Sequence, residues 1–322
     1  MQHIASRMLF TIVLAILSMP SVMAQPTLPK VIKIVVPFSP GASNDVIARA
    51  LAVPLAKRLD ATVIVENKAG AAGVIGADIV AKSPHDGSVL LLTSSTFLTA
   101  AATQAKLPYD LPAAFAPVAM IGQGPLLLAV SSSTPYKSTS DVVNAARAQP
   151  GSINYGSAGV GSIGHLATEL LDDAAKVQMV HVPYKGAANA VVDLAAGQIQ
   201  VMISSYSTLA PLIKGGKVRA LAVTSRLPHP AFADLRTVAE AVPGYAIDIW
   251  VGVFAPAGTP LALIQRLNRE ITEIAALPEL AVVLEPDGTV PVKLSPGEFA
   301  TRVQEELAQW KQIATEHKIV AE

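Results

Sequence analysis

The strongest constraint on the fold of this chain is a unit that recurs along it: a strand, a short loop rich in glycine or hydroxyl residues, and a helix. The first copy has a continuous β-branched strand over 31–36, a Pro/Ser/Gly turn, and helical spacing over 45–59. Such an apolar run is typical of a strand that is buried on both faces. Further copies follow over 62–82 and from 88 onward. Strands that alternate with helices predict an α/β fold with parallel sheets.

The second half of the chain repeats this arrangement with different loops. A turn-rich stretch over 107–117 separates the halves, and further strands are predicted at 126–130, 153–155, 179–183, 200–203 and 218–224. A last strand at 247–254 precedes a long helix to Ala275 and a terminal helix from 296 to about 317. Two such sets within 322 residues indicate two domains.

The N-terminus has the three parts of a secretory signal. Arg7 precedes an apolar run over 8–19 that is too short to cross a bilayer comfortably, and Val22-Met23-Ala24 is a small-x-Ala cleavage pattern. A core helix would need an amphipathic face, which this uniformly apolar segment lacks. We therefore expect residues 1–24 to be a signal peptide that is cleaved after Ala24, leaving an exported protein.

Composition narrows the function further. The chain has no cysteine, so disulfides, thiolate nucleophiles and Cys-ligated metals are excluded. Its formal net charge is zero and 15% of its residues are charged, with no basic arm that could neutralise phosphates. Nucleic-acid binding is therefore not expected.

The loops after the strands are the candidate binding elements. In open parallel sheets, ligands lie beyond the carboxyl ends of the strands, where helix N-termini present free N–H groups and a positive dipole end. Glycine lets the backbone approach a ligand and serine adds donors, so such loops attract anions without arginine. Each loop alone is better explained by ordinary turns and caps, but the recurrence of such loops in both halves favours binding. Three loops fit: 38–45, 93–96 and 157–162.

The sequence motifs that would indicate an enzyme are weaker. Residues 159–164 match G-x-G-x-x-G after a strand and before a helix, which leaves an exported dinucleotide-binding oxidoreductase as the alternative function. The next strand, however, ends in Pro183-Tyr184-Lys185 and offers no carboxylate for a ribose. His165 and Glu169 share a helical face, but two residues do not make a metal site. His165 and His181 are expected to cap or pack, and Asp45 is expected to be a structural carboxylate in a first helical turn.

Five motifs, in order and spacing from about Val31 to the C-terminus, resemble those of the tripartite tricarboxylate transporter receptors, also called the Bordetella uptake gene family. They are Val36-Pro37-Phe38-Ser39-Pro40-Gly41 with Asp45 and Arg49; Glu66-Asn67-Lys68 with Gly70-Ala71-Ala72-Gly73; Tyr155-Gly156-Ser157 with Gly161-Ser162 and His165-Leu166; His181-Val182-Pro183-Tyr184-Lys185-Gly186; and Ala255-Pro256-Ala257-Gly258-Thr259-Pro260.

The resemblance implies a periplasmic solute-binding receptor of the Venus-flytrap type and not an enzyme. Two α/β lobes, each a mainly parallel sheet flanked by helices, would be joined by crossing strands near 122–126 and 247–251. One lobe would then comprise 25–123 plus 247–322 and the other 124–246. The implied ligand is a small carboxylate, such as a di- or tricarboxylate, an aromatic acid or an acidic amino acid. Membrane permease subunits or a sensor kinase are the implied partners, the chain is expected to act as a monomer, and no cofactor is implied.

The resemblance also suggests which residues bind the ligand. The family often has Gly-Gly where this chain has Gly41-Ala42-Ser43, and Asp or Asn where it has Ser204-Ser205-Tyr206. Losing an acidic residue there removes a partner for an ammonium group, which favours a plain carboxylic acid over an amino acid. The roles of Tyr206, Tyr245 and Trp250 stay open. The expected ligand-binding residues are Phe38, Ser39, Gly41, Ala42, Ser43, Ser94, Ser95, Ser157, Gly161, Ser162, Gly186 and Ser204.

Overall fold

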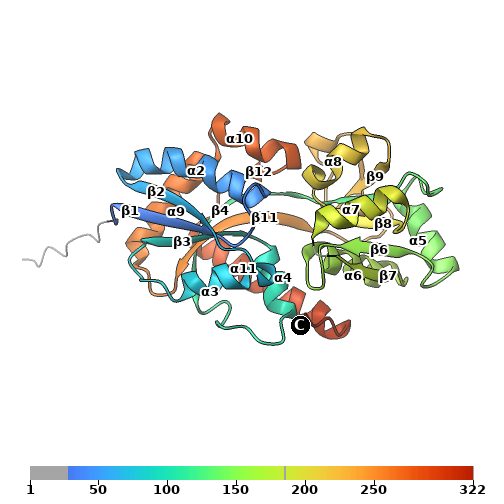
Figure 1. Ribbon diagram of the computed structural model, residues 1–322, viewed down its shortest axis with the longest axis horizontal. Coiled ribbons are helices and arrows are strands. Elements are labelled where there is room, and N and C mark those ends of the chain that lie inside the picture. The colour runs from blue at the N-terminus through green and yellow to red at the C-terminus, as the bar shows by residue number, and fades with distance from the viewer. Residues whose placement is uncertain (1–27, 185, 322) are drawn as a thin grey trace, which may run out of the picture.

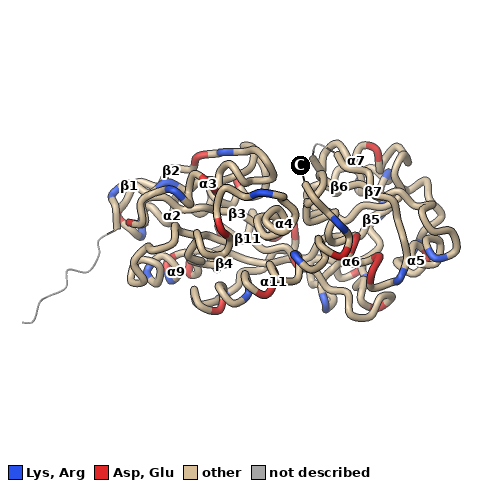
Figure 2. Tube along the Cα trace, turned by 90° about the horizontal axis from the view of Figure 1, so that it is seen from below, with Lys and Arg blue, Asp and Glu red and all other residues tan. Residues whose placement is uncertain are grey.

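The computed structural model describes residues 28–184 and 186–321, and these form two α/β lobes that lie side by side (Figure 1). The predicted signal peptide and its cleavage site, and also Lys185, lie outside the described residues. Charged residues of both signs are spread over the outer elements of both lobes (Figure 2). Within the described part of the chain, no helix combines the length and the apolar character that a membrane span requires.

The first lobe is built on a six-stranded sheet with the order β12-β4-β11-β3-β1-β2. Alternate residues of β1 face opposite sides, so that Ile32 and Ile34 pack under one layer of helices and Val35 under another. This is why the strand reads as a continuous apolar run. The strands of this sheet are β1 (Val31–Val36), β2 (Thr62–Asn67), β3 (Val89–Ser94), β4 (Phe115–Pro125), β11 (Asp248–Pro256) and β12 (Val290–Pro291).

Helices cover both faces of this sheet. One layer contains α2 (Ser43–Leu59), α9 (Leu261–Ala275) and α10 (Pro278–Leu284), whose buried residues share a core with the Ile32 side of β1. The other layer contains α3 (Val74–Ala81), α4 (Thr96–Thr103) and α11 (Pro296–Glu316). In α11, Ser295 accepts from the N–H of Glu298 at 3.2 Å in a capping box, which fixes the start of the predicted terminal helix.

The second lobe has its own six-stranded sheet with the order β10-β9-β5-β8-β6-β7. Its helices α5 (Thr139–Ala148) and α6 (Ile163–Ala175) pack on one face, and α7 (Ala187–Ala196) and α8 (Tyr206–Lys214) pack on the other. The strands are β5 (Leu127–Ser131), β6 (Asn154–Ser157), β7 (Val180–Pro183), β8 (Val201–Ser204), β9 (Val218–Val223) and β10 (Arg236–Thr237).

The two sheets are connected at a single region of the backbone. β4 leads through Leu126 directly into β5, and the chain returns through Ile247 into β11. Thr224 joins these segments: its Oγ1 accepts from the Leu126 N–H at 2.8 Å, and its carbonyl accepts from the Ile247 N–H at 2.9 Å. The long connecting strands pair antiparallel with their neighbours, so both sheets are mixed, whereas β1–β3 and β6–β8 retain the expected parallel pairing.

Candidate functional site

The helices that begin at the boundary between the lobes, each directly after a strand, include α2 after β1, α4 after β3, α6 after β6 and α8 after β8 (Figure 1). The first N–H groups of a helix have no intrahelical acceptor and carry the positive end of its dipole. A side chain at the N-cap usually satisfies one of them. Whether each of these four ends is capped therefore decides where a ligand can find donors.

The N-terminus of α2 is uncapped. Gly41 takes a left-handed φ of 82° that turns the chain into the helix, and the Ala42 N–H donates to the Ser39 carbonyl at 3.1 Å. The N-cap is Ala42, whose side chain cannot accept a hydrogen bond. Ser43 and Asn44, the first two helical residues, thus present N–H groups without acceptors in the helix.

Asp45 holds the loop before α2 in shape. One carboxylate oxygen accepts from the Gly41 N–H at 2.9 Å, and the other accepts from the Asn67 side chain at 2.9 Å. The Arg49 guanidinium forms an ion pair with the same carboxylate at 2.9 Å. The hydrogen bond from Arg49, with those from Gly41 and Asn67, outweighs burial and lowers the pKa of Asp45 to about 2. Asn67 also donates to the Phe38 carbonyl at 3.1 Å. The sequence-based prediction of a structural carboxylate agrees with this geometry.

A cavity of about 490 Å³ separates the N-terminus of α2 from that of α8. Its polar groups come from both lobes and its apolar wall comes mainly from α10. The hydroxyls at the start of α8 form a cluster, in which Ser205 Oγ lies 3.2 Å from Ser207 Oγ and 3.0 Å from Thr208 Oγ1. Ser205, the N-cap of α8, makes no side-chain cap. The cavity is lined by Gly41, Ala42, Ser43, Val46, Ser207, Thr208, Val282, Val283, Pro286 and Asp287.

A different cavity lies outside this boundary. A groove of about 730 Å³ runs between the second half of α2 and the helices α9 and α10, lined mainly by Ala50, Val53, Pro54, Ile274 and Leu280. It is larger and more apolar than the cavity between the lobes, but the N-terminus of α2 is not part of its wall. Its basic side chains are Lys57 and Arg58, and Arg58 already forms ion pairs with Glu270 and Glu273. The groove also lies within the first lobe and has no wall from the second.

The loop between β3 and α4 contributes a buried hydroxyl. Ser94 and Ser95 are both buried, and the Ser95 N–H donates to the Trp250 carbonyl at 3.0 Å. Ser95 is the N-cap of α4 but makes no side-chain cap, and its Oγ has no hydrogen-bond partner within the described residues. A buried hydroxyl without a partner is costly, so this group is a candidate for a water or ligand contact.

The loop between β6 and α6 is already satisfied internally. Ser157 Oγ lies 2.7 Å from His181 Nε2, donates to the Gly159 carbonyl at 3.0 Å and accepts from the Gly159 N–H at 3.1 Å. The Gly161 N–H donates to His165 Nδ1 at 3.2 Å, and Ser162 caps α6 by accepting from the His165 N–H at 3.4 Å. These three predicted binding residues would therefore have to exchange existing bonds in order to reach a ligand.

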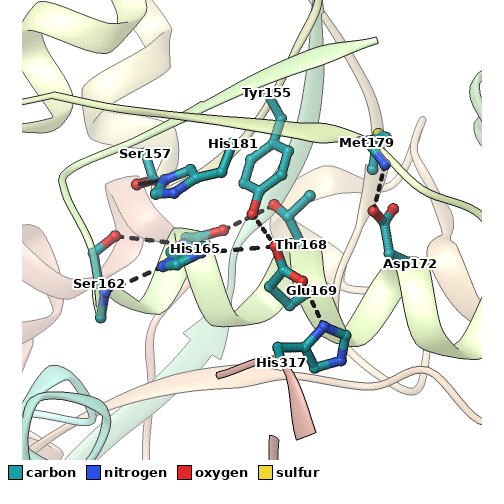
Figure 3. Close-up of polar contacts among 12 residues, drawn as sticks. Tyr155, Ser157, Ser162, His165, Thr168, Glu169, Asp172, Met179, His181 and His317 are labelled. Atoms are coloured by element: carbon teal, nitrogen blue, oxygen red, sulfur yellow. Dashed lines mark hydrogen bonds and ion pairs between the residues drawn. The ribbon is translucent and has the colours of Figure 1, made fainter. Parts of the chain in front are cut away.

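A buried polar cluster supports this loop (Figure 3). The rings of His165 and His181 stack at 3.7 Å, and Tyr155 stacks on His181 at 4.9 Å and donates to Glu169. Burial, together with the charge of His165, lowers the pKa of His181 to about 4. Burial opposes ionisation of Glu169, but hydrogen bonds from His165 and Tyr155 outweigh it and lower its pKa. Both histidines thus support the loop, as the sequence predicts.

The cluster also links the lobes. His317, next to the end of α11, places Nδ1 2.8 Å from Glu169 and Nε2 2.6 Å from Asp173, both on α6. Burial opposes the charged imidazole, but the carboxylates of Asp173 and Glu169 outweigh it and raise the pKa of His317. A second contact between the lobes is tighter: a Cβ added to Gly161 would lie 2.2 Å from Thr103 Oγ1 on α4.

The remaining predicted binding residues lie around the same boundary but outside the cavity lining. Phe38 packs on the core under α2, and Ser39 is exposed. Gly186, with φ of 125°, is the N-cap of α7 and makes no side-chain cap. Ser204 is buried at the end of β8. The structure thus brings Gly41, Ala42 and Ser43 into one cavity with α8.

Sequence reasoning did not single out Ser207, Thr208 or Asp287. The hydroxyl run 204–208 after β8 is a signal that could have extended the prediction to the first two of these residues. Asp287 lies 80 positions from Ser207 in the chain, and no local pattern reports that contact.

The three aromatic residues whose roles the sequence leaves open make structural contacts. Trp250 is fully buried and donates to Glu306 at 2.7 Å, and Tyr245 donates to the Ala167 carbonyl at 3.1 Å. Tyr206 packs on Phe232 with ring centroids 5.5 Å apart. No group of three or more metal-ligating side chains occurs in the described part of the chain.

Comparison with known proteins identifies the class that this fold and cleft define. Residues 47–319 match the family model described as tripartite tricarboxylate transporter family receptor. A relative from Pseudomonas sp. (strain P51), the UPF0065 protein in the tcbD-tcbE intergenic region, is 36% identical over 289 residues, which cover 89% of this chain and 86% of the relative. The chain therefore belongs to the tripartite tricarboxylate transporter receptor family, as its motifs predict.

Solved structures confirm the two-lobed receptor fold. R. palustris Rpa4515 with adipate matches at a TM-score of 0.79 and 34% identity, covering 90% of this chain and 98% of that one. MatC (Rpa3494) from Rhodopseudomonas palustris with bound malate matches at 0.76 and 30% identity, covering 88% and 98%. Receptors of this family are periplasmic solute-binding proteins and not enzymes, and the dinucleotide-binding alternative finds no support.

Proposed function

We propose that this receptor captures a small carboxylic acid in the cavity between its lobes, with the ligand carboxylate at the N-terminus of α2. The observation that carries this proposal is that Ala42 leaves the start of α2 uncapped where it faces a cavity lined by both lobes. The N–H groups of Ser43 and Asn44 and the Ser43 hydroxyl are the donors. Hydrogen bonds to a charged group contribute roughly 1.5–3 kcal/mol each, which is sufficient for recognition without arginine.

Several features keep these donors in place for the ligand. The bonds that Asp45 makes to Gly41, Arg49 and Asn67 fix the loop before the ligand arrives, so little conformational entropy is lost on binding. Arg49 compensates the charge of Asp45, which would otherwise repel the ligand. The adipate and malate of the two solved structures support a carboxylic acid as the ligand class.

We propose further that the lobes, 25–123 plus 247–322 and 124–246, close around the ligand by bending at the crossing near Leu126, Thr224 and Ile247. The support is that backbone continuity between the sheets is confined to this region. A ligand held by both lobes favours the closed state by its differential affinity for the two states.

The proposal includes export and delivery. The signal pattern over 1–24 supports secretion with cleavage after Ala24, and the family's name supports delivery of the ligand, by the monomeric receptor, to the permease subunits of a tripartite transporter. The mass of the mature protein purified from the periplasm tests the cleavage site. A mass that retains residues 1–24 would contradict it.

The experiment for ligand class is a melting-temperature screen with mono-, di- and tricarboxylates, aromatic acids and amino acids, each paired with its amide. At a ligand concentration 100 times Kd, binding to the folded state adds about 2.7 kcal/mol, or roughly 5–10 °C in Tm. The proposal predicts such a shift with an acid and not with its amide. No shift with any acid would refute it.

A pair of variants at one position tests the α2 donors. Ser43 is the first helical residue, and Ala42 has φ −67° and ψ 157°, a conformation that accepts a following proline. Ser43→Pro should therefore fold normally while lacking one N–H, and should weaken acid binding about ten-fold. Ser43→Ala keeps the N–H and controls for the hydroxyl. Unchanged affinity in Ser43→Pro would move the carboxylate away from α2.

A further inference from the structure

The cavity between the lobes contains an acidic group whose position has a consequence for selectivity. Asp287, at the end of the 3₁₀ turn Glu285–Asp287 in the first lobe, reaches across to the second lobe. One of its carboxylate oxygens accepts from the Ser207 N–H at 2.7 Å and the other accepts from the Ser207 hydroxyl at 3.1 Å. Both oxygens are therefore held by the first turn of α8.

The backbone around Asp287 is fitted to this contact. The next residue, Gly288, has φ of 65°, and an added Cβ would lie 2.7 Å from the Phe232 ring and 3.1 Å from the His229 ring of the second lobe. Only glycine permits so close an approach in this conformation. The turn thus contacts the second lobe at two successive residues, Asp287 and Gly288.

Charge in the cavity is one-sided. Among the described residues that line it, Asp287 alone carries an ionisable side chain, and the apolar wall is formed by Val46, Val282, Val283 and Pro286. The donors at α8 are occupied by the protein's own carboxylate, whereas those at α2 are not. A ligand with one carboxylate at α2 therefore meets an apolar wall and then a negative charge.

We propose that Asp287 is a selectivity-determining residue, which makes the receptor prefer acids with a single carboxylate and an apolar body over acids that carry a second carboxylate. This rests on the proposed placement of the ligand carboxylate at α2. A second carboxylate on a ligand in this cavity would lie within about 10 Å of Asp287, the range over which charges interact at 0.1 M salt. At low ionic strength and an effective dielectric constant of about 20, repulsion over about 10 Å reduces affinity by on the order of ten-fold.

Matched ligands and an isosteric variant test this role. Adipate and monomethyl adipate share a carbon chain and differ in one charge, and benzoate and terephthalate form a second pair. Asp287→Asn keeps an acceptor for the Ser207 N–H, so that a general loss of the lobe contact affects both members of a pair equally. Asp60→Asn is the control: it removes a negative charge at the far end of α2, where Asp60 has φ of 50°, which asparagine tolerates.

Dissociation constants measured by calorimetry at low ionic strength give the result. The wild type and Asp60→Asn should bind the monoacid of a pair about ten-fold or more tightly than the diacid, and Asp287→Asn should reduce that ratio to about three-fold or less. A wild-type preference for the diacid, or a ratio that Asp287→Asn leaves unchanged, would overturn the inference while leaving carboxylate binding intact. Failure of all four acids, and of the wider screen, to bind would overturn both proposals.

Discussion

Gly161→Ala is expected to block closure of the lobes without preventing folding. Gly161 lies in the loop before α6 of the second lobe and faces Thr103 on α4 of the first. Its N–H is already bonded to His165, so the substitution removes no free donor from the cleft. The added methyl group instead fills the space where the two lobes meet.

The magnitude follows from two separate costs. At φ of 77°, an alanine costs about 1–2 kcal/mol relative to glycine, whether the lobes are open or closed. The Cβ would also lie 2.2 Å from Thr103 Oγ1 and 3.0 Å from Thr103 Cβ, but only when the lobes are together. Overpacking of this kind costs roughly 1–3 kcal/mol. Because 1.4 kcal/mol is a factor of ten, we expect ligand affinity to fall about 30-fold.

Calorimetric titration with the best-binding acid measures the affinity, and urea unfolding measures the stability. Gly216→Ala is the matched control, since Gly216 has φ of 67° and open space around its Cβ position. It should lose stability but not affinity. Thr103→Ala combined with Gly161→Ala removes the closest clash and should restore part of the affinity. Wild-type affinity in Gly161→Ala would refute the idea that these two surfaces meet when the ligand is bound.

Three further substitutions test other parts of the account. Thr224→Val leaves the buried Leu126 N–H without its acceptor and should lower the free energy of urea unfolding by about 2 kcal/mol. Thr224→Ser keeps the hydroxyl and should not. Equal losses in the two variants would show that this hydroxyl does not stabilise the crossing between the lobes. The pKa of Asp45 is lowered to about 2, so its stabilising contribution is present above the ordinary carboxyl value of 3.8 and is lost as pH falls towards 2. The free energy of unfolding of Asp45→Asn should therefore depend less on acid pH than that of the wild type, and parallel pH profiles would exclude this role. Because the pKa of His317 is raised, its contribution to the free energy of unfolding is present below pH 6.5 and is lost as pH rises through the raised value. The stability difference between wild type and His317→Gln should therefore shrink with increasing pH. A difference that stays constant would show that His317 does not titrate against Glu169.

Local pattern predicts most of the individual elements. The β-branched run 31–36 is β1 with the same bounds, and the helical spacing up to Leu59 and Ala275 ends where α2 and α9 end. Each of these segments buries one face or both faces, so its apolar residues recur at a regular spacing that the sequence shows directly. The predicted terminal helix begins at Pro296 in the structure, directly after the Ser295 N-cap.

Long-range pairing was harder to predict. Nothing in the apolar pattern of 115–125 or 248–256 states that β4 and β11 run antiparallel to each other, because strand direction depends on where the connection goes. The short helix α10 and the turn that carries Asp287 left no pattern strong enough to predict. They line the cavity because of a contact with α8, which is distant in sequence: the Ser207 N–H donates to Asp287.

The candidate site was predicted in part for the same reason. Glycine and serine after a strand indicate a helix start, and Gly41, Ala42 and Ser43 do line the cavity. The pattern does not indicate whether such groups are already bonded. Ser157 and Ser162 look like Ser43 in sequence, but the former bonds to His181 and the latter caps α6. Sequence thus proposes donors, and only tertiary contacts distinguish free donors from occupied ones.

Small-angle scattering with and without a saturating acid, combined with a titration of the same acid and its amide, is the most direct measurement of two-lobed carboxylate capture. We predict that the acid binds, that its amide does not, and that the acid alone reduces the radius of gyration as the lobes close. Scattering profiles that superimpose with and without the bound acid, or an amide that binds as tightly as its acid, would contradict the account.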